Sequence, residues 1–410
     1  MKIIADLHIH GKYSRATSKY LSIENLEKYA RIKGVDLLGT GDFTHPEWIN
    51  ELKENLVEND SGILMTKTGF PFILQTEISL IYTQNNKGRR VHLIVLAPTF
   101  KVVDKITNYL LEYGRVDYDG RPIFKISCRD FTKDLKEISK DIEIIPAHIW
   151  TPWFGLLGSK SGFDSVEEAF GDQSKHIFAL ETGLSSDPAM NWRLSCLDKY
   201  TLISNSDLHS FWPWRMGRES NILELKEIEK VMDLSYGKII NCLKNKQVST
   251  IEVDPGYGKY HFDGHRKCCV SMGPEETKKN KGICPSCGNP LVIGVLNRVE
   301  KLADRPEGFI LPNAQKYLTL MPLSELIVMV KGFKLGTKKN NLEYDKIVNS
   351  KMANSSRNRS EYYILLDAPE SELLGLMDRE MVKVILKNRN GKIKVNPGYD
   401  GEYGVPVYDL

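Results

Sequence analysis

The chain has 410 residues, of which 41% are hydrophobic and 27% charged, and its formal net charge is +3. This length is sufficient for two or three domains, and the nearly balanced charge by itself says little about a nucleic-acid partner. Because no apolar run approaches the length of a membrane span, and no repeat or low-complexity tract is present, the sequence excludes a membrane-spanning protein and a repeat protein.

The first strand of the chain ends in a candidate metal-binding motif. Residues Lys2–Ala5 form a short apolar strand that runs into Asp6-Leu7-His8-Ile9-His10. Side chains on a strand alternate between two faces, so Asp6, His8 and His10 should point to the same side. Two imidazoles and a carboxylate on one edge indicate half of a metal coordination sphere.

Six further strand-like runs carry histidine or carboxylate side chains in the same kind of place. They are Val35–Thr40, followed by Gly41-Asp42-Phe43-Thr44-His45; Phe72–Thr76, followed by Glu77; Arg90–Leu96, which contains His92; Ile142–Ala147, followed by His148; Ile177–Leu180, followed by Glu181; and Thr201–Asn205, followed by Ser206-Asp207-Leu208-His209.

Helical segments between these strands predict parallel β/α units. The clearest helix is Ser22–Lys33, in which Ser22 is a typical N-cap and Gly34 lies just past the end. In parallel β/α barrels the carboxyl ends of the strands share one face, and the active site lies there. We therefore expect the polar residues that end these strands to form one site.

The predicted metal ligands are a mixed set of imidazoles and carboxylates, namely His8, His10, Asp42, His45, Glu77, His92, His148, Asp207 and His209. This mixture fits two or three divalent ions (Zn²⁺, Mn²⁺ or Mg²⁺) better than a single zinc. His92 is favoured as a ligand, with a core histidine as the alternative, and Glu181 is expected to orient a ligand rather than bind metal.

A site of this kind needs no serine or cysteine nucleophile, because one ion lowers the pKa of a bound water and paired ions hold the attacking and leaving oxygens of an in-line displacement. Asp207 and His209 are the candidate catalytic residues at its strongest motif. Arg15, just past the first motif, is a further candidate that would bind a phosphate oxygen, with a surface arginine as the alternative.

A second cluster comprises Gly264-His265-Arg266-Lys267-Cys268-Cys269 and Cys284-Pro285-Ser286-Cys287-Gly288. Its spacing, H-x2-C and C-x2-C on either side of fifteen residues, predicts a zinc ribbon with a closed, structural Zn²⁺ site rather than free thiols or a disulfide. The predicted ligands are His265, Cys268, Cys284 and Cys287, and Cys269 is the alternative to His265.

The remaining cysteines and the N-terminus indicate a cytoplasmic protein. Cys128, Cys196 and Cys242 are scattered and are expected to be buried thiols. Met1 leads directly into a strand, so we expect no signal peptide.

A basic segment lies near the C-terminus. Residues 331–360 hold eight Lys or Arg against two acids, and they include Lys338, Lys339, Arg357 and Arg359. We predict a mobile loop between an apolar helix at Pro322–Val330 and Tyr362–Leu366. The loop either contacts a phosphate backbone or is merely solvated, and the neighbouring ribbon favours the nucleic-acid contact.

Tryptophans follow two of the metal-site positions directly: Trp150 and Trp153 after His148, and Trp212 and Trp214 after His209. Aromatic side chains beside such a site stack on bases or form an apolar pocket for one. The alternative is hydrophobic packing of the barrel rim, which we expect for at least two of them.

The successive metal motifs resemble those of the PHP (polymerase and histidinol phosphatase) superfamily, over roughly residues 1–250. The matching residues are Asp6-Leu7-His8-Ile9-His10, Thr40-Gly41-Asp42, Glu77, His148 and Asp207-Leu208-His209. The resemblance implies a distorted seven-stranded β/α barrel that holds two or three divalent ions and hydrolyses phosphoesters. One departure is that Phe43-Thr44 separate Asp42 from His45, so the resemblance leaves open which of the two binds metal directly.

The whole chain is similar to the zinc-ribbon branch of that superfamily, the archaeal endonuclease Q family. Matching segments are Asp6–His10, Ala147–Trp153, Asn205–His209, Asp263–Arg266 with its cysteines, Leu302–Glu307 and Asn396–Gly401. The resemblance implies cleavage of damaged double- or single-stranded DNA on the 5′ side of a deaminated base (hypoxanthine, uracil or xanthine) or of an abasic site. At the family level it also implies a replication sliding clamp as a partner, although the C-terminus shows no clamp motif.

Such an enzyme would turn the damaged nucleotide out of the stack into a pocket. Backbone N–H donors in the pocket would accept the carbonyl of a deaminated base and reject an exocyclic amine. Two glycine turns, Asp254–Gly258 and Pro397–Tyr399, are candidates to bring backbone close, with ordinary surface turns as the alternative.

The sequence therefore predicts an α/β protein with three parts. These are a PHP phosphoesterase barrel over residues 1–250, an inserted or appended zinc ribbon over 251–297, and a small C-terminal α/β region over 298–410 that contacts DNA. Two other functions stay open. A PHP-type small-molecule phosphatase would need neither ribbon nor basic loop, and a non-catalytic DNA-binding protein would have a degenerate barrel.

Overall fold

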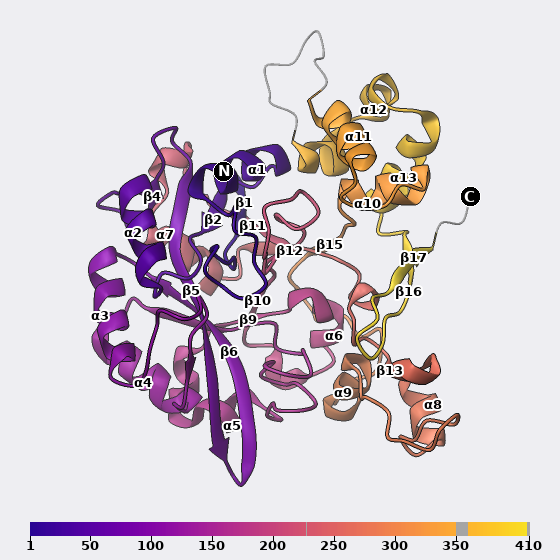
Figure 1. The fold of residues 1–410 in the computed structure, drawn as a ribbon, viewed down its shortest axis with the longest axis horizontal. Coiled ribbons are helices and arrows are strands. Elements are labelled where there is room, and N and C mark those ends of the chain that lie inside the picture. Colours follow the sequence, from indigo (N-terminus) through magenta and orange to yellow (C-terminus); the bar gives the residue numbers. More distant parts are fainter. Residues whose placement is uncertain (227, 350–359, 408–410) are drawn as a thin grey trace.

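The computed structural model describes residues 1–226, 228–349 and 360–407. Within these ranges the centre of the molecule is an 11-stranded mixed sheet in the order β15-β12-β11-β1-β2-β5-β4-β3, with β6 and β7 paired to β5 and β8 paired to β6 (Figure 1). Its strands are β1 (Lys2–Asp6), β2 (Leu37–Gly39), β3 (Val57–Glu58), β4 (Leu64–Met65), β5 (Pro71–Gln84), β6 (Lys87–Ala97), β7 (Ile123–Phe124), β8 (Glu143–Pro146), β11 (Ser220–Glu224), β12 (Val248–Glu252) and β15 (Tyr317–Thr319).

All seven predicted strands form, as β1, β2, β5, β6, β8, β9 (Ala179–Glu181) and β10 (Thr201–Ile203). The pairs β1–β2, β2–β5 and β9–β10 are parallel, as β/α units require. The pairs β5–β6 and β6–β8 are antiparallel instead. The reason is a two-residue turn at Asn85-Asn86, whose φ angles of 54° and 57° are those of a hairpin turn that reverses the chain.

The helices lie outside this sheet for the most part. Helix α1 (Ile23–Lys33) begins after Ser22, whose side chain accepts from the Asn25 N–H, and ends before Gly34 at φ 95°, as predicted. None of the helices in the described ranges combines the length and the apolar character that crossing a bilayer requires. The other α-helices are α2 (Pro46–Asn55), α3 (Phe100–Leu111), α4 (Cys128–Ile138), α5 (Val166–Phe170), α6 (Pro188–Asn191), α7 (Tyr236–Lys244), α8 (Pro274–Lys279), α9 (Val295–Leu302), α10 (Leu323–Lys331), α11 (Lys338–Val348), α12 (Glu370–Leu376) and α13 (Arg379–Arg389).

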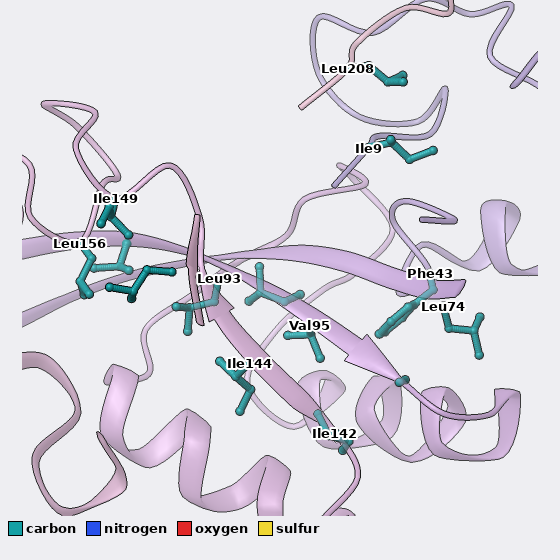
Figure 2. Close-up of a cluster of buried hydrophobic side chains, with 14 of the residues drawn as sticks. Ile9, Phe43, Leu74, Leu93, Val95, Ile142, Ile144, Ile149, Leu156 and Leu208 are labelled. Carbon is teal, nitrogen blue, oxygen red and sulfur yellow. The ribbon is translucent and has the colours of Figure 1, made fainter. Parts of the chain in front are cut away.

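The two faces of the sheet bury separate apolar clusters, because successive strand residues point to opposite faces. Leu93 and Val95 of β6 belong to the larger cluster, which includes side chains of α3 and α4, and Figure 2 shows them beside Ile144 of β8. Ile94 of the same strand belongs to a second cluster, with residues of β1, β11 and α7. Together these clusters hold the strand ends in fixed positions.

Hydrogen bonds also join strand ends that are far apart in sequence. The Asp207 N–H donates to the His8 carbonyl, and the His10 N–H donates to the Leu208 carbonyl. The Ile149 N–H donates to the Glu181 carbonyl. The segments after β1, β8, β9 and β10 are therefore neighbours, while closure of a seven-stranded barrel stays a prediction.

The two predicted glycine turns lie against each other. The Gly398 N–H donates to the Gly256 carbonyl and the Gly404 N–H to the Tyr257 carbonyl, beside the hairpin β16 (Lys394–Asn396) and β17 (Val405–Val407). A Cβ at Gly398 would lie 2.4 Å from the Gly258 carbonyl oxygen, so glycine allows the two turns to approach. The glycines thus dock the C-terminal hairpin onto the segment after β12.

The C-terminal helices form their own apolar cluster and are tied to α1 through Glu361. The buried Glu361 carboxylate accepts from Lys33 Nζ at 2.7 Å, from the Leu323 N–H at 2.9 Å and from the Tyr344 hydroxyl at 2.8 Å. The prediction of a loop is wrong for Lys338 and Lys339. These two residues begin α11, because the side chain of Thr337 caps that helix. Arg357 and Arg359 lie outside the described residues.

Candidate metal centre

Most of the predicted metal ligands converge at the strand ends. His8 and His10 follow β1, His148 follows β8, and Asp207 and His209 follow β10, whereas His92 lies within β6. The sequence predicts that Glu77 follows the end of a strand, but Glu77 lies in the middle of β5. Three residues here have left-handed backbone, Asp42 at φ 43°, His148 at φ 31° and Asp207 at φ 46°, a strain that tends to collect at functional sites.

A first group of potential ligands consists of His8, His10, Glu77 and Asp207, with one ligand atom from each lying within 4.8 Å of the others. Asp207 Oδ1 lies 3.0 Å from His10 Nε2 and 3.8 Å from His8 Nε2. These three atoms are buried and form no hydrogen bond of acceptable geometry within the described part of the chain. Lone pairs that face one another without hydrogens between them fit a bound cation.

A second group consists of Glu77, His92 and His148. Glu77 Oε1 lies 2.8 Å from His92 Nδ1 and 3.0 Å from His148 Nε2. The other oxygen, Oε2, lies 3.3 Å from His10 Nε2 in the first group. Glu77 therefore joins the two groups, which is the arrangement of a carboxylate between two ions.

Two further carboxylates hold the histidines of the first group in place. Glu181 accepts from His8 Nδ1 at 3.0 Å, and Asp42 accepts from His10 Nδ1 at 3.0 Å. Asp42 also accepts from the Gly11 N–H and the Ser14 hydroxyl. These bonds turn the Nε2 atoms toward Glu77 and Asp207, as carboxylates behind metal-bound histidines do.

Negative charge dominates the centre. Burial lowers the pKa of His8, but Glu181 and Glu77 outweigh it and raise that pKa well above its ordinary value. Burial raises the pKa of Glu77, but His92, Arg121 and His8 bring it well below its ordinary value. Carboxylates kept ionised in a buried site favour divalent cations, so the donor set fits the predicted metals.

The structure does not bring every predicted residue into these groups. Asp42 lies behind His10, and His45 caps the start of α2 with its ring stacked on Tyr13 at 4.5 Å. His209 lies beside His10, with ring centroids 4.7 Å apart, and its Nδ1–H donates to the Asp207 carbonyl. Asp6 instead accepts from the Ser206 N–H, and burial raises its pKa to about 6.

Arg15 lies away from the groups, and another arginine reaches them. The Arg15 side chain is 79% exposed, 3.6 Å from Asp119. Arg121, which the sequence did not single out, donates from Nη1 to Glu77 Oε2 at 3.0 Å. It lies in the loop between α3 and β7 with no motif around it, so only the tertiary structure reveals it.

A separate group contains His265, Cys268, Cys284 and Cys287, all within 4.8 Å of one another. His265 Nδ1 lies 3.3 Å from Cys287 Sγ, and the Asn289 N–H lowers the pKa of the Cys287 thiol. Cys269 is exposed and outside the group, at φ 53° after a short 3-10 turn. Three thiols and an imidazole fit a closed tetrahedral zinc site.

The tryptophans divide between core and rim. Trp150 is fully buried and donates to Asn191. Trp153 is 37% exposed and lies edge-on to Tyr260, with ring centroids 5.4 Å apart. Trp212 is also exposed and stacks on Trp214 at 5.4 Å. The chain segments that follow His148 and His209 therefore each present an exposed tryptophan.

Comparison with known proteins gives no match to any protein-family model. The chain is 34% identical to the uncharacterised protein MJ0043 of Methanocaldococcus jannaschii over 310 residues, and it spans only 36% of that protein's length. It is 28% identical to the uncharacterised protein YqxK of Bacillus subtilis, over 98% of both chains.

Two solved structures match almost the full chain. The lesion-specific endonuclease PfuEndoQ of Pyrococcus furiosus is 30% identical, with a TM-score of 0.86 over 99% of this chain and 95% of that one. An endonuclease Q in complex with a 27-mer duplex that carries an abasic lesion at the active site is also 30% identical, with a TM-score of 0.85 over 99% and 96% of the two chains.

The mixed α/β fold and the two groups joined by Glu77 define a metal-dependent hydrolase of the PHP phosphoesterase class. The similarity to PfuEndoQ extends beyond the metal centre to the cysteine-containing and C-terminal segments. The chain therefore belongs to the endonuclease Q family.

Proposed function

We propose that this protein is a DNA-repair endonuclease that hydrolyses the phosphodiester 5′ of a deaminated base or an abasic site. The observation that supports the proposal most is the coincidence of a two-group metal centre with full-length similarity to an endonuclease Q that holds an abasic duplex. A small-molecule phosphatase would account for the metal centre but not for the similarity beyond it.

In the proposed reaction water attacks the phosphorus directly, and no covalent enzyme intermediate forms. The oxygen of water forms a new bond to phosphorus, and the bond from phosphorus to the preceding nucleotide's O3′ breaks. That oxygen takes up a proton, balanced by the one that the attacking water releases, which leaves a 3′-hydroxyl, and the phosphate remains on the 5′ oxygen of the lesion nucleotide. Divalent ions in the centre would supply activation of the water and stabilisation of both oxygens.

The protein's own part is to place the ions. We propose that His8, His10, Glu77 and Asp207 hold one ion and that Glu77, His92 and His148 hold a second. His209 donates through Nδ1–H to Asp207, which leaves its Nε2 lone pair for an ion or a substrate proton. Asp42 and Glu181 fix the ligand histidines from behind.

His265, Cys268, Cys284 and Cys287 are proposed to hold a structural zinc ion. The apolar cluster around them consists of Met272, Cys284 and Leu291, with Cys268 and Val270 at its edge. Burial of so few apolar side chains is too small to stabilise a folded segment of this size. A bound metal ion would provide the missing stability.

A basic and aromatic strip supports DNA as the partner. Arg218 donates to the carbonyl of Ser206, next to Asp207, and lies near Arg215 and Tyr403. Lys259 lies 4.5 Å from the centre of the Tyr403 ring, which is half exposed. Guanidinium, ammonium and aromatic groups of this kind suit a phosphate backbone with unstacked bases.

Deaminated bases are proposed as substrates because a carbonyl replaces an amine on their Watson–Crick edge. The two glycine turns contact each other, so their inward backbone groups are already paired and are not free for a base. Any backbone donors that select the carbonyl therefore belong to other segments.

The test uses matched duplexes that carry one hypoxanthine, one uracil, one abasic site or no lesion. With Mn²⁺ or Mg²⁺, cleavage one bond 5′ of the lesion with a 3′-hydroxyl end is expected, and the undamaged duplex should stay intact. Hydrolysis of a phosphomonoester without cleavage of any duplex would replace the proposal with a phosphatase. Duplex binding without hydrolysis of either substrate would indicate a non-catalytic DNA-binding protein.

A further inference from the structure

Arg121 is the arginine that enters the metal centre. Its Nη1 donates to Glu77 Oε2 at 3.0 Å, and its side chain remains 24% exposed. Within residues 1–226, 228–349 and 360–407, no other arginine makes a hydrogen bond or ion pair to the side chain of His8, His10, Glu77, His92, His148 or Asp207. A cation at this position attracts an anionic substrate that the surrounding carboxylates would otherwise repel.

The loop that carries Arg121 is held firmly against the first metal motif. The Asp119 carboxylate accepts from the backbone N–H groups of Arg15 and Arg121, and the Gly120 N–H donates to the Tyr13 carbonyl. A Cβ at Gly120 would lie 2.4 Å from Asp42 Oδ2, so glycine is required for this approach. The guanidinium is therefore positioned before any substrate arrives.

The Arg121 guanidinium also has donors to spare. It carries five N–H groups, and within the described residues it makes one hydrogen bond, the one to Glu77. Its planar fork matches two oxygens of a phosphate group, whereas a lysine ammonium offers only a point charge. An arginine guanidinium stays charged at every pH at which proteins are folded, so it can pair with a phosphate.

We infer that Arg121 is a catalytic residue that binds the non-bridging oxygens of the scissile phosphodiester and stabilises the charge that develops on them. This role rests on the proposed phosphodiester hydrolysis, but not on the choice of lesion. It takes over the function that the sequence assigned to Arg15, whose side chain turns toward Asp119 at the surface.

The test compares Arg121→Gln and Arg121→Lys with the wild type, and Arg115→Gln serves as the matched control. Arg115 belongs to the same loop, but its side chain is exposed and, among the residues that the structure describes, pairs with Asp117 alone. Arg121→Gln should lower kcat about 10²–10³-fold, the usual effect of removing one charge-stabilising donor. Arg121→Lys should lie between Arg121→Gln and wild type, and Arg115→Gln should match wild type.

Three further measurements separate a phosphate contact from a merely structural one. Barrel metal content by mass spectrometry and thermal stability should stay at the wild-type level in Arg121→Gln. The inhibition constant of inorganic phosphate should rise about tenfold, since one charged hydrogen bond is lost. A kcat within about threefold of wild type, or loss of barrel metal from the variant, would overturn the inference, because the arginine would then be dispensable or act only through Glu77.

The same assays distinguish this inference from the proposed function. Bis(p-nitrophenyl) phosphate with Mn²⁺ is used beside the lesion duplexes. If wild type hydrolyses the small diester but no duplex, the proposed lesion specificity fails while the Arg121 effect is still measured. If both substrates are cleaved and only wild type and Arg115→Gln are fast, both proposals stand.

Discussion

The metal centre and the cysteine-containing module are built in opposite ways. The centre collects residues from strands and strand ends spread over residues 8–207, and those residues are mostly buried. The module collects its four residues from positions 265–287, and most of them are partly exposed. The first depends on the whole fold being complete, whereas the second lies within one short segment.

This difference follows from how each site is supported. Glu181 and Asp42 fix His8 and His10 by hydrogen bonds, on strands that two apolar clusters hold in place. The module has few apolar side chains, so its own packing contributes little. We expect loss of metal to stop the chemistry of the first site and to unfold the second.

Asp207→Asn should have the largest effect on activity. An uncharged amide is a poor ligand for a divalent ion, so cleavage should be abolished while DNA binding and the melting temperature stay close to wild type. Cleavage assays, filter binding and calorimetry measure these three quantities. Asp104→Asn, in an exposed ion pair with Lys53, is the control, and normal turnover by Asp207→Asn would remove Asp207 from the centre.

Cys284→Ser should affect the module and spare the centre. Loss of one thiolate should release about one zinc ion per chain and speed hydrogen exchange over residues 260–295. Hydrolysis of a small diester should persist, because the metal centre lies in other elements. Cys196→Ser is the control, because Cys196 lies outside the group and is exposed rather than buried as predicted. Unchanged zinc content and thermal stability in Cys284→Ser would contradict the zinc assignment.

Asp42→Asn should lower metal affinity or kcat about 10–100-fold, the usual cost of losing a carboxylate behind a metal-bound histidine. His45→Gln should have a smaller effect, because His45 stacks on Tyr13 and does not reach either group. Metal titration with activity as the readout compares the two variants. Loss of barrel metal from His45→Gln alone would make His45 the direct ligand that the sequence left open.

Glu219→Gln should raise the stability of the central sheet at alkaline pH. Burial raises the pKa of Glu219 to about 8, and the negative charge of Glu181 adds to the rise. Hydrogen bonds from Ser204 and Val253 and the charge of Arg218 lower that pKa but do not outweigh burial. The buried Glu252 lies nearby. Because the pKa is raised on folding, the wild-type protein loses stability as the pH rises from about 4.5 to about 8.

The glutamine variant cannot ionise at this position. It should exceed wild type by up to about 5 kcal/mol at pH 9, since a pKa raised from 4.5 to about 8 costs roughly 1.4 kcal/mol per unit, and it should match wild type near pH 4.5. Urea unfolding of the two proteins at both pH values measures the difference. An equal advantage at both pH values would show that packing, not ionisation, is responsible.

The double variant Lys338→Ala, Lys339→Ala should have the smallest effect of these changes, a weaker affinity for DNA. These exposed lysines begin α11, so they are fixed in space rather than on a loop. If both contact phosphates, the slope of log affinity against log salt should fall by roughly 0.9 for each, with lesion preference unchanged. Lys133→Ala on α4 is the control, and an unchanged slope would mean that the two lysines are only solvated.

Much of the fold follows from local sequence signals. Seven strands and the capped helix α1 appear where alternation, Ser22 and Gly34 predict them. The predicted strand Phe72–Thr76 stops eight residues before the end of β5 at Gln84, so it does not reach the hairpin signal Asn85-Asn86 or predict the antiparallel return of β6. A strand that is buried on both faces gives no periodic signal at which to stop.

The sequence by itself determined the chemistry: which residues carry imidazole, carboxylate and thiolate, and that most of them lie at strand ends or at the spacing of a zinc ribbon. Only the tertiary structure decided how these side chains lie relative to one another. It places Asp42 behind His10, lets Glu77 contact both groups and brings the Arg121 guanidinium to Glu77. The reason is that hydrogen bonds between segments such as 13–15 and 119–121 are set by packing across the whole fold, and no local pattern encodes that packing.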